Sequence, residues 1–512
     1  MGLISVNFFI FVLVALISYF LFPDRYKWVV LLGFSFAYYV IICGKFIPFM
    51  LLTILTTYLA TRTIDSIYKK MTQTVKENKA VWDRDMRKSY KKKMENKAKY
   101  VMLAALVFNF GILAFFKYFG KVMPLGISFY TFQTMGYLID VYHEKVEAEK
   151  NIGKVALYVS FFPQIIQGPI GMYPDLAEQL YKPHRFSLKR IEKAGLLVLW
   201  GMFKKMVIAD RAVGIINLVT ADTTAYTGSY ILLAVLVYAL QLYADFSGGI
   251  DIVRGIAEMF GITMAENFRR PYFSKSLTEY WHRWHITLGN WVRTYVFYPL
   301  SISKRFLKMG KWLNNHAGKH FGKVIPTSIA SLITFLIIGV WHGANSKYIA
   351  FGLWNGLVIM ITELLQPVTD KVIEKLHINV KSKIYGFVCI VWTFLLVLVG
   401  YYFDVAANCG EAVNMMLKSV ADFNITDFSY IMSVLEQSGL DMVDAVTVVL
   451  GGVVILIVSL IQEKKNIEIR SWILCQNRIL RWGIIYAAIF TVLLMGFYGP
   501  GIGASDFVYM QF

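Results

Sequence analysis

The sequence predicts an all-α membrane protein that crosses the bilayer several times. Of its 512 residues, 57% are hydrophobic and only 17% are charged, and the mean hydropathy is +0.53. A soluble globular protein does not have so apolar a composition. Apolar stretches about as long as a transmembrane helix also recur along the chain. We therefore expect one integral membrane domain over residues 1–512, surrounded by membrane lipid and without a nucleic-acid partner.

Three apolar segments open the chain, at residues 3–22, 28–43 and 46–59. The first has no basic leading region and no small-residue cleavage site after it, so we expect a retained transmembrane helix. A basic loop follows at residues 68–99, of which 69–99 hold twelve Lys or Arg and four acids. Because basic loops stay in the cytoplasm, this pattern predicts a cytoplasmic loop and an extracytoplasmic N-terminus.

The segments between residues 100 and 245 mix apolar runs with Gly, Pro, Lys and Asp. At about 20 apolar residues per helix, the whole chain offers roughly 10 to 13 spans. Residues 161–170 (FFPQIIQGPI) carry two prolines with Gly168 near the second, which predicts a broken or re-entrant segment. Such backbone is tolerated at membrane depth only where protein covers it or where it lines a watery cavity.

The C-terminal half alternates between basic and acidic connections. Residues 304–323 hold six basic side chains and no acid, whereas 404–441 hold six acids and one lysine. This pattern predicts that 304–323 and 367–383 are cytoplasmic and that 404–441 and the C-terminus are extracytoplasmic. The apolar runs between these connections lie at residues 329–341, 349–362, 384–403, 443–461 and 483–498.

His342 is a candidate functional residue because it directly follows the apolar run at residues 329–341. An ionisable group at or within a bilayer is costly, so by default it marks a functional site. His342 follows Lys323 by 19 residues. A helix between them, at about 1.5 Å per residue, spans roughly 28 Å. In a hydrocarbon core about 30 Å thick, His342 falls in the outer half. The plain alternative is a surface turn at residues 341–347.

A second reactive group lies at residues 280–285 (YWHRWH), where His282, Arg283 and His285 stand among aromatic rings. The surrounding stretch 267–300 is too charged for a span and is typical of an amphipathic segment at the cytoplasmic face or dipping into the protein. At helical spacing, one stripe of this segment carries Trp281, Trp284, Leu288 and Trp291. The alternative is an interfacial helix whose tryptophans lie at headgroup level.

The sequence indicates neither a metal site nor a disulfide framework. Its four cysteines are far apart and none belongs to a CxxC pair. Glu279 and His282 share one face at i, i+3 spacing, but a di-iron site needs a second such pair and further carboxylates. We therefore expect no bound metal and no resident cofactor.

Several short motifs, taken together and in order, resemble the membrane-bound O-acyltransferase family. They are residues 124–132 (PLGISFYTF), 161–170, 243–248 (YADFSG), 266–268 (ENF) with 271–272 (PY), 284–288 (WHITL), 341–343 (WHG) and the ending 507–512 (FVYMQF). The resemblance covers nearly the whole chain. It is closest to the alginate O-acetyltransferase branch, with the teichoic acid D-alanyl transferases nearer than the eukaryotic lipid enzymes.

This resemblance implies a ring of helices around a central tunnel, through which an acyl group passes from a cytoplasmic thioester to a hydroxyl outside. The family's catalytic histidine, in its Trp-His-Gly setting, falls on His342, and its second histidine falls on His285. His282 occupies the variable position of that motif. Trp284, Trp341 and Asn345 are the further substrate-binding positions that we expect.

General chemistry agrees with these roles. A hydroxyl is a poor nucleophile near neutral pH and needs a base as it attacks a thioester carbonyl. We assign that role to His342, whose neutral form a dry site would favour. His285 then positions the thioester or polarises its carbonyl, and Arg283 contacts an anionic donor. The family often has Arg-Asp-Tyr where this chain has Thr294 in the middle, so an aspartate there must be dispensable or replaced.

Donor and acceptor stay open at this point. Basic loops suit both acetyl-CoA and an acidic carrier protein, although the loop at 68–99 is explained equally well by anionic lipid or by topology. The branch favours acetyl transfer, with D-alanyl or another acyl transfer to a cell-wall polymer as an alternative. We expect a plasma-membrane protein, a polysaccharide acceptor and an extracytoplasmic esterase-like partner. A transporter or flippase, or an inactive assembly platform, would use similar architecture without acyl transfer.

Overall fold

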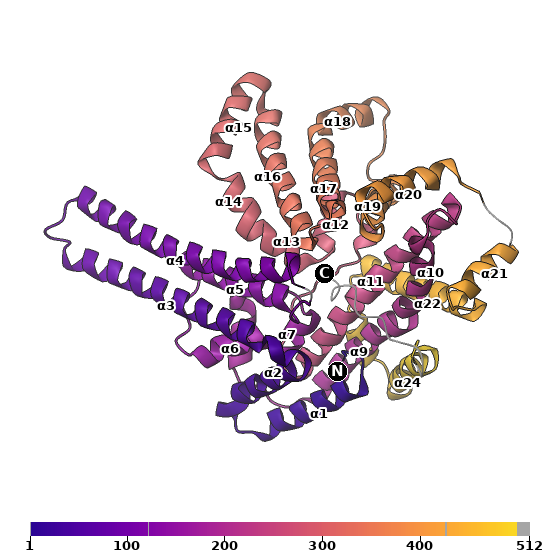
Figure 1. Ribbon diagram of the computed structural model, residues 1–512, viewed down its shortest axis with the longest axis horizontal. Coiled ribbons are helices and arrows are strands. Elements are labelled where there is room, and N and C mark those ends of the chain that lie inside the picture. The colour runs from indigo at the N-terminus through magenta and orange to yellow at the C-terminus, as the bar shows by residue number, and fades with distance from the viewer. Residues whose placement is uncertain (1, 121, 425–427, 499–512) are drawn as a thin grey trace. The chain divides into compact units, whose positions relative to one another are not determined.

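The computed structural model describes residues 2–120, 122–424 and 428–498 (Figure 1). Its regular elements within these ranges are all helical, and the β-type pairing there is one isolated antiparallel bridge between Phe268 and Trp284. The predicted all-α class is therefore confirmed. The expected motif at residues 507–512 lies outside the described residues.

Seven helical stretches of the described chain are long and apolar enough to cross a membrane. An eighth arises if α17 (Ser346–Leu364) and α18 (Gln366–Lys375), which meet at 54°, form one span. The seven are Asp24–Glu77, Arg84–Tyr118, Gly228–Met259, Lys319–His342, Lys383–Val405, Met442–Lys465 and Arg478–Met495. The expected 10 to 13 spans exceed this number because several apolar runs between residues 123 and 219 form helices too short to cross alone. The protein is thus a multi-pass membrane protein.

The chain divides into two compact units, of which the first comprises residues up to Gly195 together with Val253–Ala265. Its helices are α1 (Val6–Leu21), α2 (Lys27–Cys43), α3 (Ile47–Glu77), α4 (Arg84–Tyr118), α5 (Ile127–Tyr142), α6 (Ile152–Ser160), α7 (Phe162–Gln167) and α8 (Tyr173–Tyr181). The apolar segments expected at 3–22, 28–43 and 46–59 correspond to α1, α2 and the first part of α3.

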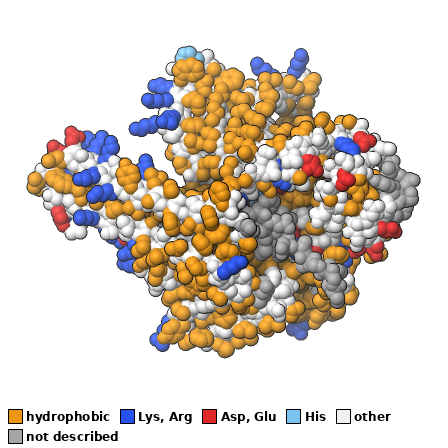
Figure 2. All heavy atoms as spheres, viewed as in Figure 1, with side chains coloured by type: hydrophobic (Ala, Val, Ile, Leu, Met, Phe, Trp, Pro, Cys, Tyr) orange, Lys and Arg blue, Asp and Glu red, His pale blue; other side chains and the backbone are white. Residues whose placement is uncertain are grey.

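The basic stretch at 68–99 is helical over most of its length and not an irregular loop, while its cytoplasmic side stays a prediction. Helices α3 and α4 continue through it as a hairpin, and only residues 78–83 lie between them. Asp83 caps α4 by accepting a hydrogen bond from the Met86 amide at 2.6 Å. Lysines and arginines are good helix formers, so a charged run can lengthen a helix instead of ending it. Lys and Arg side chains gather around the hairpin's tip in Figure 2.

The expected break at residues 161–170 is confirmed. Helix α6 ends at Ser160, α7 has only six residues, and residues 168–172 are not helical. The whole stretch is buried within protein, as irregular backbone at membrane depth requires. Gly126 (φ 68°) packs directly on this segment, and a Cβ there would collide with the carbonyl of Ile165. The motifs at 124–132 and 161–170 thus form one packed feature of the first unit.

The second unit comprises Leu196–Ile252 and the residues from Glu266 onward, and its helices position the candidate site. Helices α9 (Leu188–Met202) and α11 (Gly228–Met259) each belong to both units. The remaining elements are a π-helical segment Phe203–Ala209, α10 (Asp210–Ala221), a 3-10 turn Pro271–Phe273, α12 (Leu277–Arg283), α13 (Ile286–Val292), a π-helical segment Arg293–Phe297, α14 (Tyr298–Ser301), α15 (Lys304–Ala317), α16 (Lys319–His342), α17, α18, α19 (Lys383–Val405), α20 (Cys409–Ala421), α21 (Phe428–Gln437), α22 (Met442–Lys465), α23 (Ile469–Leu474) and α24 (Arg478–Met495).

Buried ion pairs hold α11 against the π-helical segment that precedes α10. The Lys205 ammonium lies 2.6 Å from Asp245 and 2.9 Å from Asp210, and Lys204 lies 2.7 Å from Asp251. Charges taken out of water must be paired, and removing one partner of such a pair typically costs about 3–5 kcal/mol. The aspartate of the YADFSG motif is therefore an anchor for α11, on which the next residue, Phe246, reaches the candidate site.

Candidate functional site

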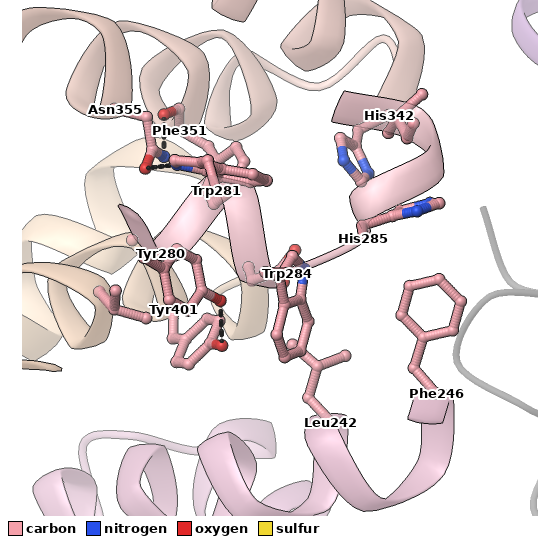
Figure 3. A pocket seen from close by; sticks show the side chains of 14 residues that line it. Leu242, Phe246, Tyr280, Trp281, Trp284, His285, His342, Phe351, Asn355 and Tyr401 are labelled. Carbon is pink, nitrogen blue, oxygen red and sulfur yellow. Dashed lines mark hydrogen bonds between the residues drawn. The ribbon is translucent and has the colours of Figure 1, made fainter. Parts of the chain in front are cut away.

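His285 and His342 line the same pocket, which lies wholly within the second unit (Figure 3). The pocket is small, with a cavity volume of about 50 Å³. Its walls come from α11, α12, α13, α16, α17 and α19. They are formed by Leu242, Phe246, Tyr280, Trp281, Trp284, His285, Leu288, His342, Phe351, Asn355, Val397, Gly400, Tyr401 and Asp404.

His285 lies at a sharp break between two short helices. Helix α12 ends at Arg283, Trp284 is extended, and His285 adopts the left-handed conformation (φ 46°, ψ 51°) before α13 begins. A non-glycine residue there costs of order 1–3 kcal/mol, and such strain clusters at functional sites. The break also means that Trp281, Trp284, Leu288 and Trp291 do not share one helical stripe, so that sequence interpretation is wrong.

Backbone pairing with residues 267–269 holds this break in place. The Arg269 amide donates to the carbonyl of Arg283 at 2.9 Å, and the Ile286 amide donates to the carbonyl of Asn267 at 3.0 Å. These bonds satisfy backbone groups that the interrupted helix leaves without helical partners.

Asn267 is a functional candidate that the sequence analysis missed. Its Oδ1 accepts hydrogen bonds from the Thr287 amide at 3.0 Å and the Thr287 hydroxyl at 2.9 Å, and it lies 3.2 Å from Nδ1 of His285. An amide oxygen only accepts, so we assign the imidazole proton to Nδ1. The lone pair of the neutral ring is then on Nε2.

Burial, followed by the nearby imidazole of His342, lowers the pKa of His285 to about 3. The side chain is 4% exposed, and the ring of Phe246 packs edge-on against it with centroids 4.9 Å apart. Water is excluded from such a site, which penalises the charged imidazolium. His285 is therefore neutral at physiological pH.

His342 is the last residue of α16 and lies at the tip of a tight helical hairpin, since α17 begins after residues 343–345. Its ring stacks on Tyr348 at 5.9 Å and meets Phe351 edge-on at the same centroid distance. Figure 3 shows the imidazoles of His342 and His285 next to each other at one side of the pocket. Two imidazole rings thus face one small cavity.

The other expected binding residues have mixed placements. Trp284 lines the pocket, whereas Trp341 is buried beside the ring of His342 (4.8 Å) and does not line it. Asn345 caps α17 by accepting from the Lys347 amide at 3.1 Å, and its amide donates to the carbonyl of Ala407 at 2.9 Å. The structure therefore gives Asn345 a capping role away from the pocket walls.

Arg283 and His282 also lie outside the pocket walls. The Arg283 guanidinium pairs with Glu279 at 2.7 Å and with Glu463 at 2.9 Å. Nε2 of His282 is 3.4 Å from Arg293, at an exposed position. His285 therefore lines the pocket and His282 does not.

The pocket has a second polar wall that the sequence did not reveal. The hydroxyls of Tyr280 and Tyr401 are 2.9 Å apart, and Asp404 accepts a hydrogen bond from Tyr238 at 2.9 Å. The carbonyl of Asp404 also accepts from Lys347 at 2.9 Å. A carboxylate directly after an apolar run is the available signal, but the charge pattern places Asp404 in the connection at 404–441.

No group of three or more His, Cys, Asp or Glu side chains suited to a metal ion occurs in the part of the chain that the structure describes. Glu279 accepts from the Lys275 amide at 2.8 Å in addition to pairing with Arg283.

Comparisons with known proteins agree with the architecture. Residues 149–399 match the sequence model of MBOAT, the membrane-bound O-acyltransferase family. The probable alginate O-acetylase AlgI of Pseudomonas syringae pv. tomato is 33% identical over 312 residues, 60% of this chain and 54% of its own length. The peptidoglycan O-acetyltransferase of Helicobacter pylori is 27% identical over 57% of this chain and 61% of its own.

The teichoic acid D-alanyltransferase of Bacillus subtilis is 28% identical over 46% of this chain and 58% of its own length. The matched regions thus span somewhat more than half the length of these relatives. The family match includes both pocket histidines and the backbone that positions them. Nearly half of this chain thus matches the membrane-bound O-acyltransferase family, and alginate O-acetylases are among its relatives.

Proposed function

We propose that this protein is a membrane-bound O-acyltransferase. It moves an acyl group, most simply acetyl, from a cytoplasmic thioester to a hydroxyl on an extracytoplasmic polysaccharide or on an extracytoplasmic esterase-like partner. The observation that supports this best is the shared pocket of His285 and His342 within the family-matched region. The names of the relatives, which include acetylases of alginate and peptidoglycan, support a polymer acceptor.

His342 acts as the general base in this proposal. Its imidazole takes the proton from the acceptor hydroxyl while that oxygen forms a bond to the thioester carbonyl carbon. The carbon–sulfur bond then breaks, and the departing thiolate receives the proton from the imidazolium. The aromatic rings around His342 keep water from competing as the acceptor.

His285 acts as a positioning residue next to this base. With its proton on Nδ1 and directed to Asn267, Nε2 can accept a hydrogen bond but cannot donate one. This tautomer supports orientation of an O–H or amide N–H group of a substrate more than polarisation of the thioester carbonyl. The lowered pKa of His285 keeps this acceptor available at neutral pH.

Purified protein in lipid vesicles with radiolabelled acetyl-CoA and an oligosaccharide acceptor tests the proposal. We expect label to reach the acceptor with the wild type and not with His342→Ala, whereas His282→Ala, outside the pocket, retains transfer. Equal transfer by wild type and His342→Ala would contradict the base assignment. Movement of unmodified substrate across the bilayer without label transfer would support a transporter.

A D-alanyl donor carried by an acidic carrier protein is the second candidate, because the teichoic acid D-alanyltransferase is among the relatives. The same vesicles loaded with D-alanyl-carrier thioester distinguish the donors. Faster turnover with this donor than with acetyl-CoA would favour it.

A further inference from the structure

Two arginines close in sequence to the pocket residues Trp284 and His285 both pair with one carboxylate, that of Glu463. Glu463, in the last turn of α22, receives a charge-assisted hydrogen bond at each carboxylate oxygen. Nε of Arg270 lies 2.5 Å from Oε2, and Nη1 of Arg283 lies 2.9 Å from Oε1. The side chain of Arg270 is 21% exposed, that of Arg283 is 19% exposed and that of Glu463 is 28% exposed. Solvent can therefore still reach this ion-pair cluster.

This arrangement has the geometry of an anion-binding site. Two guanidiniums converge on the two oxygens of one anion, and guanidinium donors match phosphate as well as they match carboxylate. Arg270 is also in the left-handed conformation (φ 49°, ψ 59°), immediately before Pro271. Such strain is typical of binding sites and indicates that the direction of this side chain is fixed by its surroundings.

The same two segments carry the two arginines and the pocket residue His285. Arg270 follows the paired stretch 267–269, and Arg283 is separated from His285 only by the pocket residue Trp284. All of these residues belong to the second unit. Short, hydrogen-bonded backbone segments therefore connect the two arginines, which would hold the anion, to the pocket residues.

We propose that Arg270 and Arg283 bind the phosphate next to the pantetheine arm of the thioester donor, and that Glu463 occupies this site when the donor is absent. This inference rests on the proposed function and specifies its donor as a phosphopantetheine thioester. Coenzyme A and a carrier protein's prosthetic arm share that phosphate chemistry. Glu463 thus acts as an internal competitor, which the donor phosphate displaces as its thioester enters the pocket.

Binding of 4′-phosphopantetheine and of pantetheine to the full-length protein in lipid nanodiscs, measured by calorimetry without acceptor, tests this site. The two compounds differ only in the phosphate. We expect the wild type to bind 4′-phosphopantetheine at least tenfold more tightly than pantetheine. Arg283→Gln and Arg270→Gln should abolish this difference, and Glu463→Gln should increase it severalfold because the competing anion is gone.

Arg269→Gln is the matched control. This neighbouring arginine pairs with Glu266 at 2.9 Å, is 59% exposed and takes no part in the ion-pair cluster. It should leave the preference for the phosphate unchanged. Arg283→Lys, which retains the charge without the planar fork, should fall between the wild type and Arg283→Gln. Variants are compared only where the thermal unfolding midpoint stays close to that of the wild type.

Equal affinity of the wild type for the two compounds would overturn the proposal. A weaker preference for 4′-phosphopantetheine in Glu463→Gln than in the wild type would also overturn it. Coenzyme A and a holo-carrier protein, added separately, show which source of the phosphate binds better. Because no acyl transfer is measured, a phosphate-dependent affinity in a protein that transfers no label would support this site while contradicting the proposed function. Label transfer without any phosphate preference would do the reverse.

Discussion

Two long helical hairpins, α3–α4 and α16–α17, differ in the surroundings of their tips. The α3–α4 hairpin turns through residues 78–83, and its tip carries exposed basic side chains. The α16–α17 hairpin turns through only residues 343–345, and its tip places His342 among the rings of a pocket. The comparison indicates that a hairpin tip can line a pocket only where neighbouring helices enclose it, as they do around His342.

Glycines account for much of this difference in packing. A Cβ on Gly339 would collide with the carbonyl of Tyr348, and a Cβ on Gly352 would collide with the carbonyl of Phe335. The backbones of helices α16 and α17 are therefore in direct contact, a close packing that small residues allow between membrane helices. Gly111 on α4 has open space where its Cβ would be.

The largest expected effect comes from the tip of the second hairpin. His342→Ala should lower the turnover of acyl transfer by about 10² to 10⁴, the usual contribution of a general base. The affinity for donor should be unchanged within a factor of two. Steady-state transfer in vesicles, combined with calorimetry of donor binding, separates these effects. A large loss of donor affinity with normal turnover would reassign His342 to binding.

The next effect concerns the close approach of α16 and α17. Gly339→Ala should destabilise the protein by about 1–3 kcal/mol because the new methyl group meets backbone that cannot yield easily. Gly111→Ala is the matched control and should be neutral or slightly stabilising, since alanine favours helix. Thermal unfolding in detergent measures both. Equal midpoints would show that the hairpin tolerates separation.

Asn267→Ala should lower turnover by about tenfold. The change removes the acceptor of both Thr287 hydrogen bonds and of His285 Nδ1, so the tautomer and orientation of the ring are no longer fixed; loss of such a supporting partner typically costs about 10–100-fold. Asn267→Asp retains the acceptor and adds a charge, which should raise the pKa of His285. A pH–rate profile that shifts in Asn267→Asp and not in the exposed-site variant His316→Ala would support positioning over a purely structural role.

The pH dependence of stability gives a smaller and independent test. The pKa of His285 is about 3 in the folded protein and about 6.5 when exposed. The unfolded state therefore binds the extra proton first, so this contribution to stability is fully present above about pH 6.5 and is lost as the pH falls toward 3. His285→Gln should flatten the decline of the unfolding midpoint across this range, and an unchanged decline would contradict the buried neutral state.

The smallest effect is expected in the basic part of the first hairpin. Replacing Lys91, Lys92 and Lys93 of α4 by Gln should leave acyl transfer within a factor of two, because these residues form no part of the pocket. Binding to vesicles rich in anionic lipid should weaken as charges are removed, at about 1 kcal/mol per lysine near the surface. A tenfold loss of transfer with normal expression would instead indicate that this hairpin recruits the donor.

The sequence alone determined the class and most of the apolar helices, because hydropathy depends only on composition over about 20 residues. It also identified the break at 161–170 from Pro and Gly, and His342 and His285 through their motifs. The lysine-rich residues 68–99 are mostly helical and not an irregular loop, because a charge pattern indicates the side of the membrane and not the conformation of the backbone.

Only the tertiary structure decided which residues surround the two histidines. The break at Trp284 and His285 is stabilised by residues 267–269, which precede α12 and are outside its helical period, so local periodicity could not reveal it. The same is true of Asn267 as the partner of His285, of Asp404 in the pocket wall, and of Glu463 between two arginines. Each depends on a contact between distant segments, and such contacts leave no periodic signal in the chain.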